Sequence, residues 1–303
     1  MNKKINILIV GGTGFIGFYL ARKCLELGWS VTSISARKPR KIRKLPRVKY
    51  LISDISKKNF FKVLKTDFDY VVNLGGYVDH SNKKKNYKTH YQGSVHLANF
   101  FLNKKIKRFV QVGSGGEYGK AKSPQKEIKN SKPLSVYSKS KYLAAKYLLK
   151  IYKTKKFPIT IFRLYQVYGP RQDLNRFIPI VIHNCIKNKT FPCSNGKQYR
   201  DFIYVTDVIS AILRCFKKDK SNGKVINLGS GKPLKIKNII FLIKKITKGG
   251  KPQLGKINFR KEENLITYPN ILRAKKLLKW KPKIDFKLLA QDMVKNDLNL
   301  IKK

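Results

Sequence analysis

The stretch "INILIVGGTGFIG", residues 5–17, decides the fold. Its first part, residues 5–10, is a nearly continuous apolar run, as expected of a strand buried on both faces of a parallel sheet. A glycine-rich turn follows, and then a helical pattern that ends at Gly28. Glycines at such a turn let the backbone approach a pyrophosphate, whose charge a helix N-terminus stabilises. The stretch therefore predicts a dinucleotide site made by Gly11, Gly12, Thr13, Gly14, Phe15, Ile16 and Gly17.

Apolar segments and helical patterns alternate through the first half of the chain. This alternation predicts a Rossmann-type, doubly wound parallel sheet of the α/β class. Beyond residue 169 the regularity breaks, and we expect a smaller C-terminal α/β substrate domain. The expected strands lie at 5–10, 30–35, 48–55, 69–76, 108–114 and 158–169, the dinucleotide-binding domain at 1–168, and the substrate region at 169–303, with about 200–230 returning to the first domain.

The end of the second expected strand distinguishes the two nicotinamide dinucleotides. An NAD site usually places an acid there, which binds the ribose 2′-hydroxyl. This chain instead has Ser35 and Arg37, which suit a 2′-phosphate through charge-assisted hydrogen bonds; the alternative is that Arg37 is one more surface cation of a basic protein. We therefore expect NADP as the preferred cofactor, with NAD as the alternative. Asp54, at the end of the third expected strand, is expected to bind the adenine amino group or to cap a turn.

The stretch "YSKSK", residues 137–141, opens a helical pattern with Tyr137 and Lys141 one turn apart on the same face. A free tyrosine side chain has a pKa near 10 and is a poor base at neutral pH. A lysine ammonium nearby favours the phenolate form, so the pair suits acid–base chemistry. Ser114 ends the fifth expected strand in "VQVGSGGEYG", residues 110–119, and would hydrogen-bond the same oxygen that Tyr137 protonates or deprotonates.

These motifs resemble those of the extended short-chain dehydrogenase/reductase family, in its nucleoside-diphosphate-sugar epimerase/dehydratase group. They follow the family's order and spacing over nearly the whole chain: "GGTGFIG", "GSGGEYG", "YSKSK", "RLYQVYGPRQ", "RDFIYVTDV", "NLGSG" and the late "LLKWKPK". The resemblance implies an NAD(P)-dependent enzyme that acts on nucleotide sugars, with a place in polysaccharide biosynthesis. It also implies that Ser114, Tyr137 and Lys141 form the catalytic set.

The resemblance extends to the residues that bind substrate and cofactor. Arg200 matches the arginine that binds the nucleotide diphosphate, and its alternative is a salt bridge to Asp201 or Asp207. Gln166 and His90 stand where the family often has Asn. Surface or loop-capping roles are the alternatives for the other substrate candidates. The expected substrate-binding set is Asp79, His80, Gln166, Arg171, Arg176 and Arg200, and the cofactor set further includes Ile55, Leu74, Gly75 and Gly76.

Two glycines after Ser114 reduce the number of reactions that the chain is expected to catalyse. Relatives that eliminate water across C5 and C6 carry an Asp-Glu pair directly after the catalytic Ser or Thr, where this chain has Gly115 and Gly116. Glu117 would point to the opposite strand face if the strand continued, so it is a weak substitute. We expect reduction of the 4-keto group of a nucleotide-linked 6-deoxy sugar. The rivals are an NAD-dependent 4-epimerase and a non-catalytic NADP-sensing or nucleic-acid-binding protein.

The composition bears on partners, metal sites and cellular location. The net charge of +52 comes from 55 lysines and 13 arginines spread along the chain, which indicates a compositional bias rather than a nucleic-acid reader. The four cysteines show no paired spacing, so we expect neither a disulfide framework nor a metal site. The apolar run near the start is too short for a signal peptide, and we expect a cytoplasmic homodimer without membrane insertion.

Overall fold

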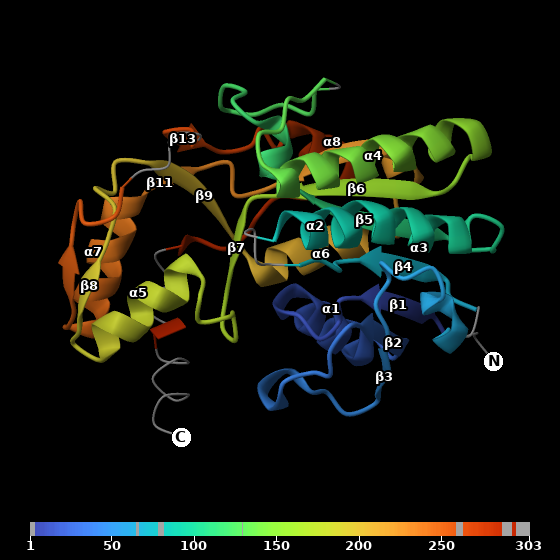
Figure 1. Cartoon of the computed structure of the whole chain (residues 1–303), viewed down its shortest axis with the longest axis horizontal. Coiled ribbons are helices and arrows are strands. Elements are labelled where there is room, and N and C mark those ends of the chain that lie inside the picture. Colours follow the sequence, from blue (N-terminus) through green and yellow to red (C-terminus); the bar gives the residue numbers. More distant parts are fainter. Residues whose placement is uncertain are drawn as a thin grey trace.

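The computed structural model describes residues 4–64, 67–77, 82–128, 130–258, 263–286 and 293–294. Within these residues the main body is a parallel sheet of seven strands in the order β10-β6-β5-β4-β1-β2-β3 (Figure 1). The chain winds outward in both directions from the adjacent strands β1 and β4, so the predicted doubly wound sheet is confirmed. The strands are β1 (Asn6–Val10), β2 (Ser30–Ser35), β3 (Val48–Ile52), β4 (Tyr70–Asn73), β5 (Arg108–Ser114), β6 (Ile159–Leu164) and β10 (Lys224–Leu228).

Both faces of this sheet are buried, as the first strand illustrates. Ile7 and Ile9 of β1 belong to one apolar cluster, and Leu8 and Val10 belong to another, because side chains alternate between the faces of a strand. Helices α1 (Phe15–Glu26), α6 (Val205–Cys215) and α8 (Leu272–Leu278) contribute to the first cluster, and α3 (Gly93–Phe101) and α4 (Val136–Lys155) to the second. The short α2 (Lys83–Tyr87) lies beside α4.

The expected strand at 158–169 is two strands in the structure. β6 ends at Leu164, and β7 (Gln166–Tyr168) pairs with β9 (Tyr199–Tyr204) in a second sheet. Tyr165, the single residue between the two strands, marks the point at which the chain changes sheet. This passage connects the main body to the smaller part.

The smaller part is built from the second sheet and two helices. Strands β11 (Pro233–Lys235) and β13 (Ile266–Thr267) flank β9, and β8 (Thr190–Pro192) pairs with β12 (Lys251–Gln253). Helices α5 (Phe177–Ile186) and α7 (Ile236–Thr247) share an apolar core with Phe202 and Phe286. The single-turn segments are η1 (Lys41–Arg43), η2 (Phe60–Val63), the π-helical η3 (Lys88–Gln92), η4 (Gly115–Tyr118) and η5 (Asp219–Ser221).

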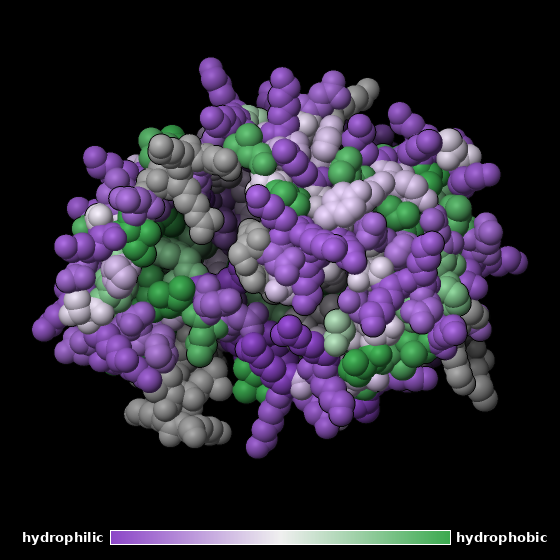
Figure 2. All heavy atoms as spheres, viewed as in Figure 1, coloured by the Kyte–Doolittle hydropathy of each residue, from purple (hydrophilic) through white to green (hydrophobic). Residues whose placement is uncertain are grey.

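The surface is mostly hydrophilic, as the many lysines of the chain lead us to expect. Figure 2 shows hydrophilic side chains over most of the visible face, with apolar side chains gathered in a hollow of the smaller part. Among the helices that the structure describes, none has the length and apolarity needed to cross a bilayer.

Candidate active site

The turn between β1 and α1 requires glycine at Gly11 and Gly17. Gly11 has φ +79°, and a Cβ there would lie 3.0 Å from the Gly75 backbone nitrogen. A Cβ on Gly17 would lie 2.3 Å from the Gly11 carbonyl oxygen, so glycine lets the helix pack directly on the turn. Gly14 caps α1 without a side-chain hydrogen bond. The turn therefore presents helix-end amides at the carboxyl edge of the sheet, which suits a phosphate.

The end of β2 lies against this turn. Ser35 is buried, and its Oγ lies 3.5 Å from the backbone nitrogen of Thr13. Arg37, two residues later, is exposed. Asp54 Oδ1 accepts a hydrogen bond from the Ser56 backbone N–H at 2.9 Å, so the capping alternative for Asp54 is present in the structure. The adenine contact of Asp54 stays a prediction.

Residues 74–76 follow β4 and face a histidine. The Leu74 N–H donates to the Val10 carbonyl at 2.9 Å, which holds this loop beside the glycine turn. A Cβ on Gly76 would lie 2.3 Å from His90 Cε1, so the imidazole packs on the Gly76 backbone. The same imidazole contacts Tyr137 edge to face, with ring centroids 4.9 Å apart. His90, which replaces a frequent Asn, thus supports the ring of Tyr137. Asp79 and His80 lie outside the described residues.

Ser114, Tyr137 and Lys141 come from the end of β5 and the first turns of α4. Lys141 is buried, and its Nζ donates to the Val112 carbonyl at 2.8 Å and lies 5.5 Å from the centroid of the Tyr137 ring. Val112 precedes Ser114 by two residues on β5, so the lysine ties the tyrosine's helix to the serine's strand. A Cβ on Gly116 would lie 2.8 Å from Ser138 Oγ, which places the segment after Ser114 against the start of α4.

Glu117 differs from the expectation of a strand that continues. β5 ends at Ser114, and the 3-10 turn η4 brings the Glu117 carboxylate back beneath the strand end. Its Oε1 accepts from the Ser114 backbone N–H at 2.8 Å, and its Oε2 accepts from Arg163 Nε at 2.8 Å. The carboxylate is fully buried and ion-paired, so it cannot stand in for the missing acid–base pair.

A tyrosine lies next to the first of the two glycines. A Cβ on Gly115 would lie 2.9 Å from the ring of Tyr165, so an acidic side chain there would collide with that ring. The Tyr165 hydroxyl donates to Gln125 Oε1 at 2.7 Å, which fixes the ring in place. Burial, opposed in part by the neighbouring Arg163, raises the pKa of Tyr165, so its hydroxyl stays protonated. The structure thus fills the space that an acid after Ser114 would need.

The arginines proposed for substrate binding lie in different surroundings. Arg200 is buried and donates to Glu263 Oε1 at 2.6 Å. Among the described residues its ion-pair partner is thus Glu263 and not Asp201 or Asp207, so the salt-bridge alternative is present with a different acid. Asp207 instead accepts from backbone N–H groups at residues 283 and 284, since the chain returns to it there.

The other candidates for substrate binding lie on β7 and between β7 and α5, where the chain passes from the main body into the smaller part. Arg171 has φ +65° and donates to the Ile42 carbonyl, and Arg43 donates to the Arg171 carbonyl. This places Arg171 against the segment that follows β2. Arg176 caps the N-terminus of α5, and Gln166 is exposed on β7. Their contacts with substrate stay predictions.

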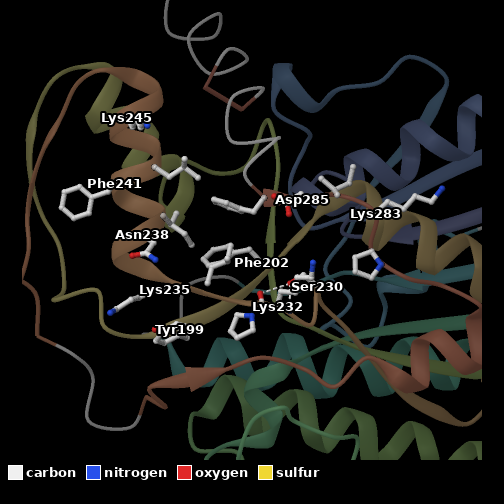
Figure 3. A pocket seen from close by; sticks show the side chains of 17 residues that line it. Tyr199, Phe202, Ser230, Lys232, Lys235, Asn238, Phe241, Lys245, Lys283 and Asp285 are labelled. Atoms are coloured by element: carbon white, nitrogen blue, oxygen red, sulfur yellow. Dashed lines mark hydrogen bonds between the residues drawn. The ribbon is translucent and has the colours of Figure 1, made fainter.

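A cavity of about 710 Å³ lies in the smaller part, between α7, β11 and residues 282–286. Phe202 lies at its centre, with Asn238 and Lys235 on one side and Lys283 and Asp285 on the other (Figure 3). Its lining contains none of the catalytic candidates. The cavity is therefore separate from the place where chemistry is expected.

The comparisons with known proteins decide the family. The model of the NAD dependent epimerase/dehydratase family matches residues 7–229. The chain belongs to this family. A putative UDP-glucose 4-epimerase of Methanocaldococcus jannaschii is 29% identical over 294 residues, which cover 93% of this chain and 94% of that protein. A CDP-abequose synthase of Salmonella muenchen is 27% identical over 280 residues, which cover 89% of this chain and 90% of that protein.

Solved structures show the same fold. The UDP-glucose 4-epimerase of Thermotoga maritima, solved with UDP-glucose, has a TM-score of 0.89 at 24% identity and covers 98% of this chain and 100% of its own. A dTDP-glucose 4,6-dehydratase of Bacillus anthracis, solved with NAD, has a TM-score of 0.85 at 24% identity, with 98% of each chain covered. The family membership confirms the resemblance drawn from the motifs and the expectation of a nicotinamide-dependent enzyme.

The sequence alone did not identify two residues that lie next to the segment after Ser114. Arg163 and Tyr165 lie in a stretch quoted only for its family pattern, "RLYQVYGPRQ". One signal was available for the first of them. Gly113 lies in a buried strand, and a Cβ there would lie 2.2 Å from Glu117 Oε1. A glycine in a buried strand marks the close approach of another group, here the carboxylate that Arg163 binds.

Proposed function

We propose that the protein reduces the 4-keto group of a nucleotide-linked 6-deoxy sugar, with NADPH as the reductant. The observation that carries this proposal is the pair Gly115 and Gly116 directly after Ser114, with the Tyr165 ring packed against the first glycine. Elimination of water needs an acid and a base near C5 and C6 of the sugar. The side chains at this position can supply neither, whereas Ser114, Tyr137 and Lys141 are all retained.

The described residues fit a dinucleotide. A Cβ at Gly11 or Gly17 would fill the turn, and α1 starts without a side-chain cap, so backbone groups can approach a pyrophosphate. Ser35 and Arg37 support NADP over NAD, because they offer a hydroxyl and a cation where an acid would repel a 2′-phosphate. When bound, the reduced cofactor would supply the hydride for C4.

The protein's own residues would manage the oxygen at C4. Tyr137 would give its proton to this oxygen, and Ser114 would donate a hydrogen bond to it. Ser114 Oγ accepts from the Gly116 N–H at 3.2 Å, which leaves the hydroxyl proton free to face a substrate. Lys141, anchored on Val112, would place its positive charge beside the phenol as the proton leaves.

The substrate's diphosphate would bind near Arg200. This arginine is buried against Glu263, and a phosphate would compete with that carboxylate for the guanidinium. Arg176, at the start of α5, and Gln166, exposed on β7, would contact the same substrate from the passage between the two parts. The relatives named for UDP-glucose and CDP-abequose support a nucleotide sugar as the substrate class. The homodimer stays a prediction.

A sugar 4-epimerase is the second candidate, supported by the relative named a putative UDP-glucose 4-epimerase. An epimerase would oxidise and then re-reduce the same carbon with a retained cofactor, and Ser114, Tyr137 and Lys141 suit that chemistry equally. The two candidates differ in their need for an external reductant.

The test supplies each 4-keto-6-deoxy sugar, linked to UDP, dTDP, GDP or CDP, together with NADPH. Absorbance at the wavelength of reduced nicotinamide should fall in proportion to the sugar consumed with one of these nucleotides. Unmodified nucleotide hexoses without added cofactor are the parallel arm. Interconversion of C4 epimers in that arm, with no NADPH consumption in the first, would replace the reductase by the epimerase.

A further inference from the structure

A buried ion pair lies directly beneath Ser114. Glu117 is fully buried, the side chain of Arg163 is 3% exposed, and Nε of the arginine lies 2.8 Å from Oε2 of the glutamate. Taking two charges out of water is costly, and the attraction between them recovers that cost only when the geometry is good. The proposed reaction uses neither Glu117 nor Arg163, so the chemistry itself does not explain why the pair is buried there.

The pair is joined to Ser114 through the backbone. Glu117 Oε1 accepts from the Ser114 N–H at 2.8 Å, while Ser114 Oγ accepts from the Gly116 N–H at 3.2 Å. The two bonds form a capping box that closes the turn η4. The turn thus fixes both the backbone and the hydroxyl oxygen of Ser114. Since that oxygen is occupied as an acceptor, the hydroxyl proton is left to donate outward.

Arg163 is held from three sides. Its guanidinium lies over the Tyr118 ring, 4.3 Å from the centroid, and it donates to Ser131 Oγ at 3.4 Å as well as to Glu117. The Tyr118 hydroxyl in turn donates to Asn227 Oδ1 on β10 at 2.6 Å. Arg163 itself lies on β6, whose Leu164 is the register partner of Ser114. The turn is therefore braced against two neighbouring strands.

Gly113 makes this arrangement sterically feasible. A Cβ there would lie 2.2 Å from Glu117 Oε1, which is closer than a carbon and a carboxylate oxygen can approach. The residue before Ser114 therefore has to be glycine for the carboxylate to reach the Ser114 N–H. Arg163 also neutralises the carboxylate, so no unpaired negative charge remains near an oxygen that gains negative charge during hydride transfer.

We propose that Glu117 and Arg163 are positioning residues, which act on the reaction through Ser114 by fixing the turn that aims its hydroxyl. This inference rests on the part that the proposed function gives to Ser114. In Glu117→Gln, one amide oxygen cannot accept from both Ser114 and Arg163, and the amide nitrogen would meet a donor. The turn then loses one of its two anchors, and the serine hydroxyl loses its fixed direction.

The test is a cycle of variants assayed for NADPH oxidation with the 4-keto sugar nucleotide. Glu117→Gln should lower kcat about 10- to 100-fold, the scale of a small misplacement of a reacting group, with KM and NADPH affinity unchanged within about twofold. The double variant Ser114→Ala/Glu117→Gln should match Ser114→Ala alone, because Glu117 has no other route to the reaction. Multiplicative losses in the double variant would overturn the inference.

Glu127→Gln is the matched control. Glu127 also accepts from a backbone N–H, that of Asn227 at 3.0 Å, and it lies 3.7 Å from an arginine, Arg273. Its loss should reduce resistance to urea and leave kcat within about twofold of the parent. Gly113→Ala is a second probe, which displaces the Glu117 carboxylate without changing any charge, and it should reproduce the loss in kcat.

The outcomes separate this inference from the proposed function. Unchanged kcat in a folded Glu117→Gln or Gly113→Ala, with kcat reduced in Ser114→Ala, would overturn the inference alone. Unchanged kcat in Ser114→Ala would contradict the role of Ser114 in the proposed reaction and remove the inference with it. An equal loss of kcat in Glu127→Gln would show a general effect of stability, which also contradicts the positioning role.

Discussion

Loss of a proton from Asp201 should lower the free energy of unfolding as the pH rises from 4 to 6. This carboxyl group lies on β9, is fully buried, and accepts from the Ser230 N–H, the Ser230 hydroxyl and the Gly231 N–H at 2.7 to 2.8 Å. Burial penalises its charged form, and these hydrogen bonds offset only part of the penalty. The pKa of Asp201 is therefore raised to about 6, from an ordinary value of 3.8.

The sign and size of the effect follow from this shift. Between pH 4 and pH 6 the folded protein holds a proton on Asp201 that the unfolded chain has released, so rising pH favours unfolding. A difference of about two pKa units corresponds to about 3 kcal/mol in the free energy of unfolding. The stabilisation that the bound proton gives should be nearly complete below about pH 4. It should be lost progressively as the pH rises through 6, and it should be absent above about pH 7.

The assay compares wild type with Asp201→Asn, which has no proton to exchange. Urea unfolding, followed by the fluorescence of Trp29 and Trp280, gives the free energy of unfolding at each pH from 4 to 7. Over this range the difference between the two proteins should shift by about 2 to 3 kcal/mol in favour of the variant, whatever its offset at pH 4. Parallel curves over the whole range would show that the pKa of Asp201 is not raised in the folded protein.

Three further predictions concern the cofactor, the acid–base group and a turn. Arg37→Ala should weaken NADPH binding about 10- to 100-fold and leave NADH binding nearly unchanged, as measured by fluorescence titration; equal NADH and NADPH affinities in the wild type would contradict it. Tyr137→Phe should keep NADPH affinity and lower turnover by about 100-fold, and unchanged turnover would remove Tyr137 from the mechanism. Gly119→Ala should lower the free energy of unfolding by more than Gly255→Ala, because both have positive φ but only the first Cβ would meet another atom, the Lys132 carbonyl oxygen at 2.0 Å; equal losses in urea unfolding would refute the steric reason.

Local sequence was sufficient for the parts of the fold that depend on neighbouring residues. β5 lies at Arg108–Ser114, as its apolar run predicted, and α1 starts where the glycine turn ends. The break between β6 and β7 was not predictable in this way. No turn residue lies between the two strands, and the pairing of β7 with β9, more than thirty residues later, is what separates them.

The site, like the fold, could be predicted only where it depends on residues that are close in sequence. The spacing of Tyr137 and Lys141 identified one helix face, and the structure places both at the end of β5. The role of Glu117 depended on Arg163, 46 residues away, and that of Arg200 on Glu263, 63 residues away. Such partners carry no local pattern, because a buried charge needs an opposite charge near it in space and not in sequence. For the pair Glu117 and Arg163, Gly113 was a local sign of a close approach.

The most direct test of the central claim follows the hydride. NADPH carrying deuterium at the transferred position of the nicotinamide is incubated with the protein and a nucleotide-linked 4-keto-6-deoxy sugar, and the product is examined by NMR and mass spectrometry. A C4 reductase should place one deuterium at C4 of the sugar and leave C5 and C6 unlabelled and unchanged. Loss of water from an unmodified nucleotide hexose, or C4 inversion without uptake of deuterium, would contradict it.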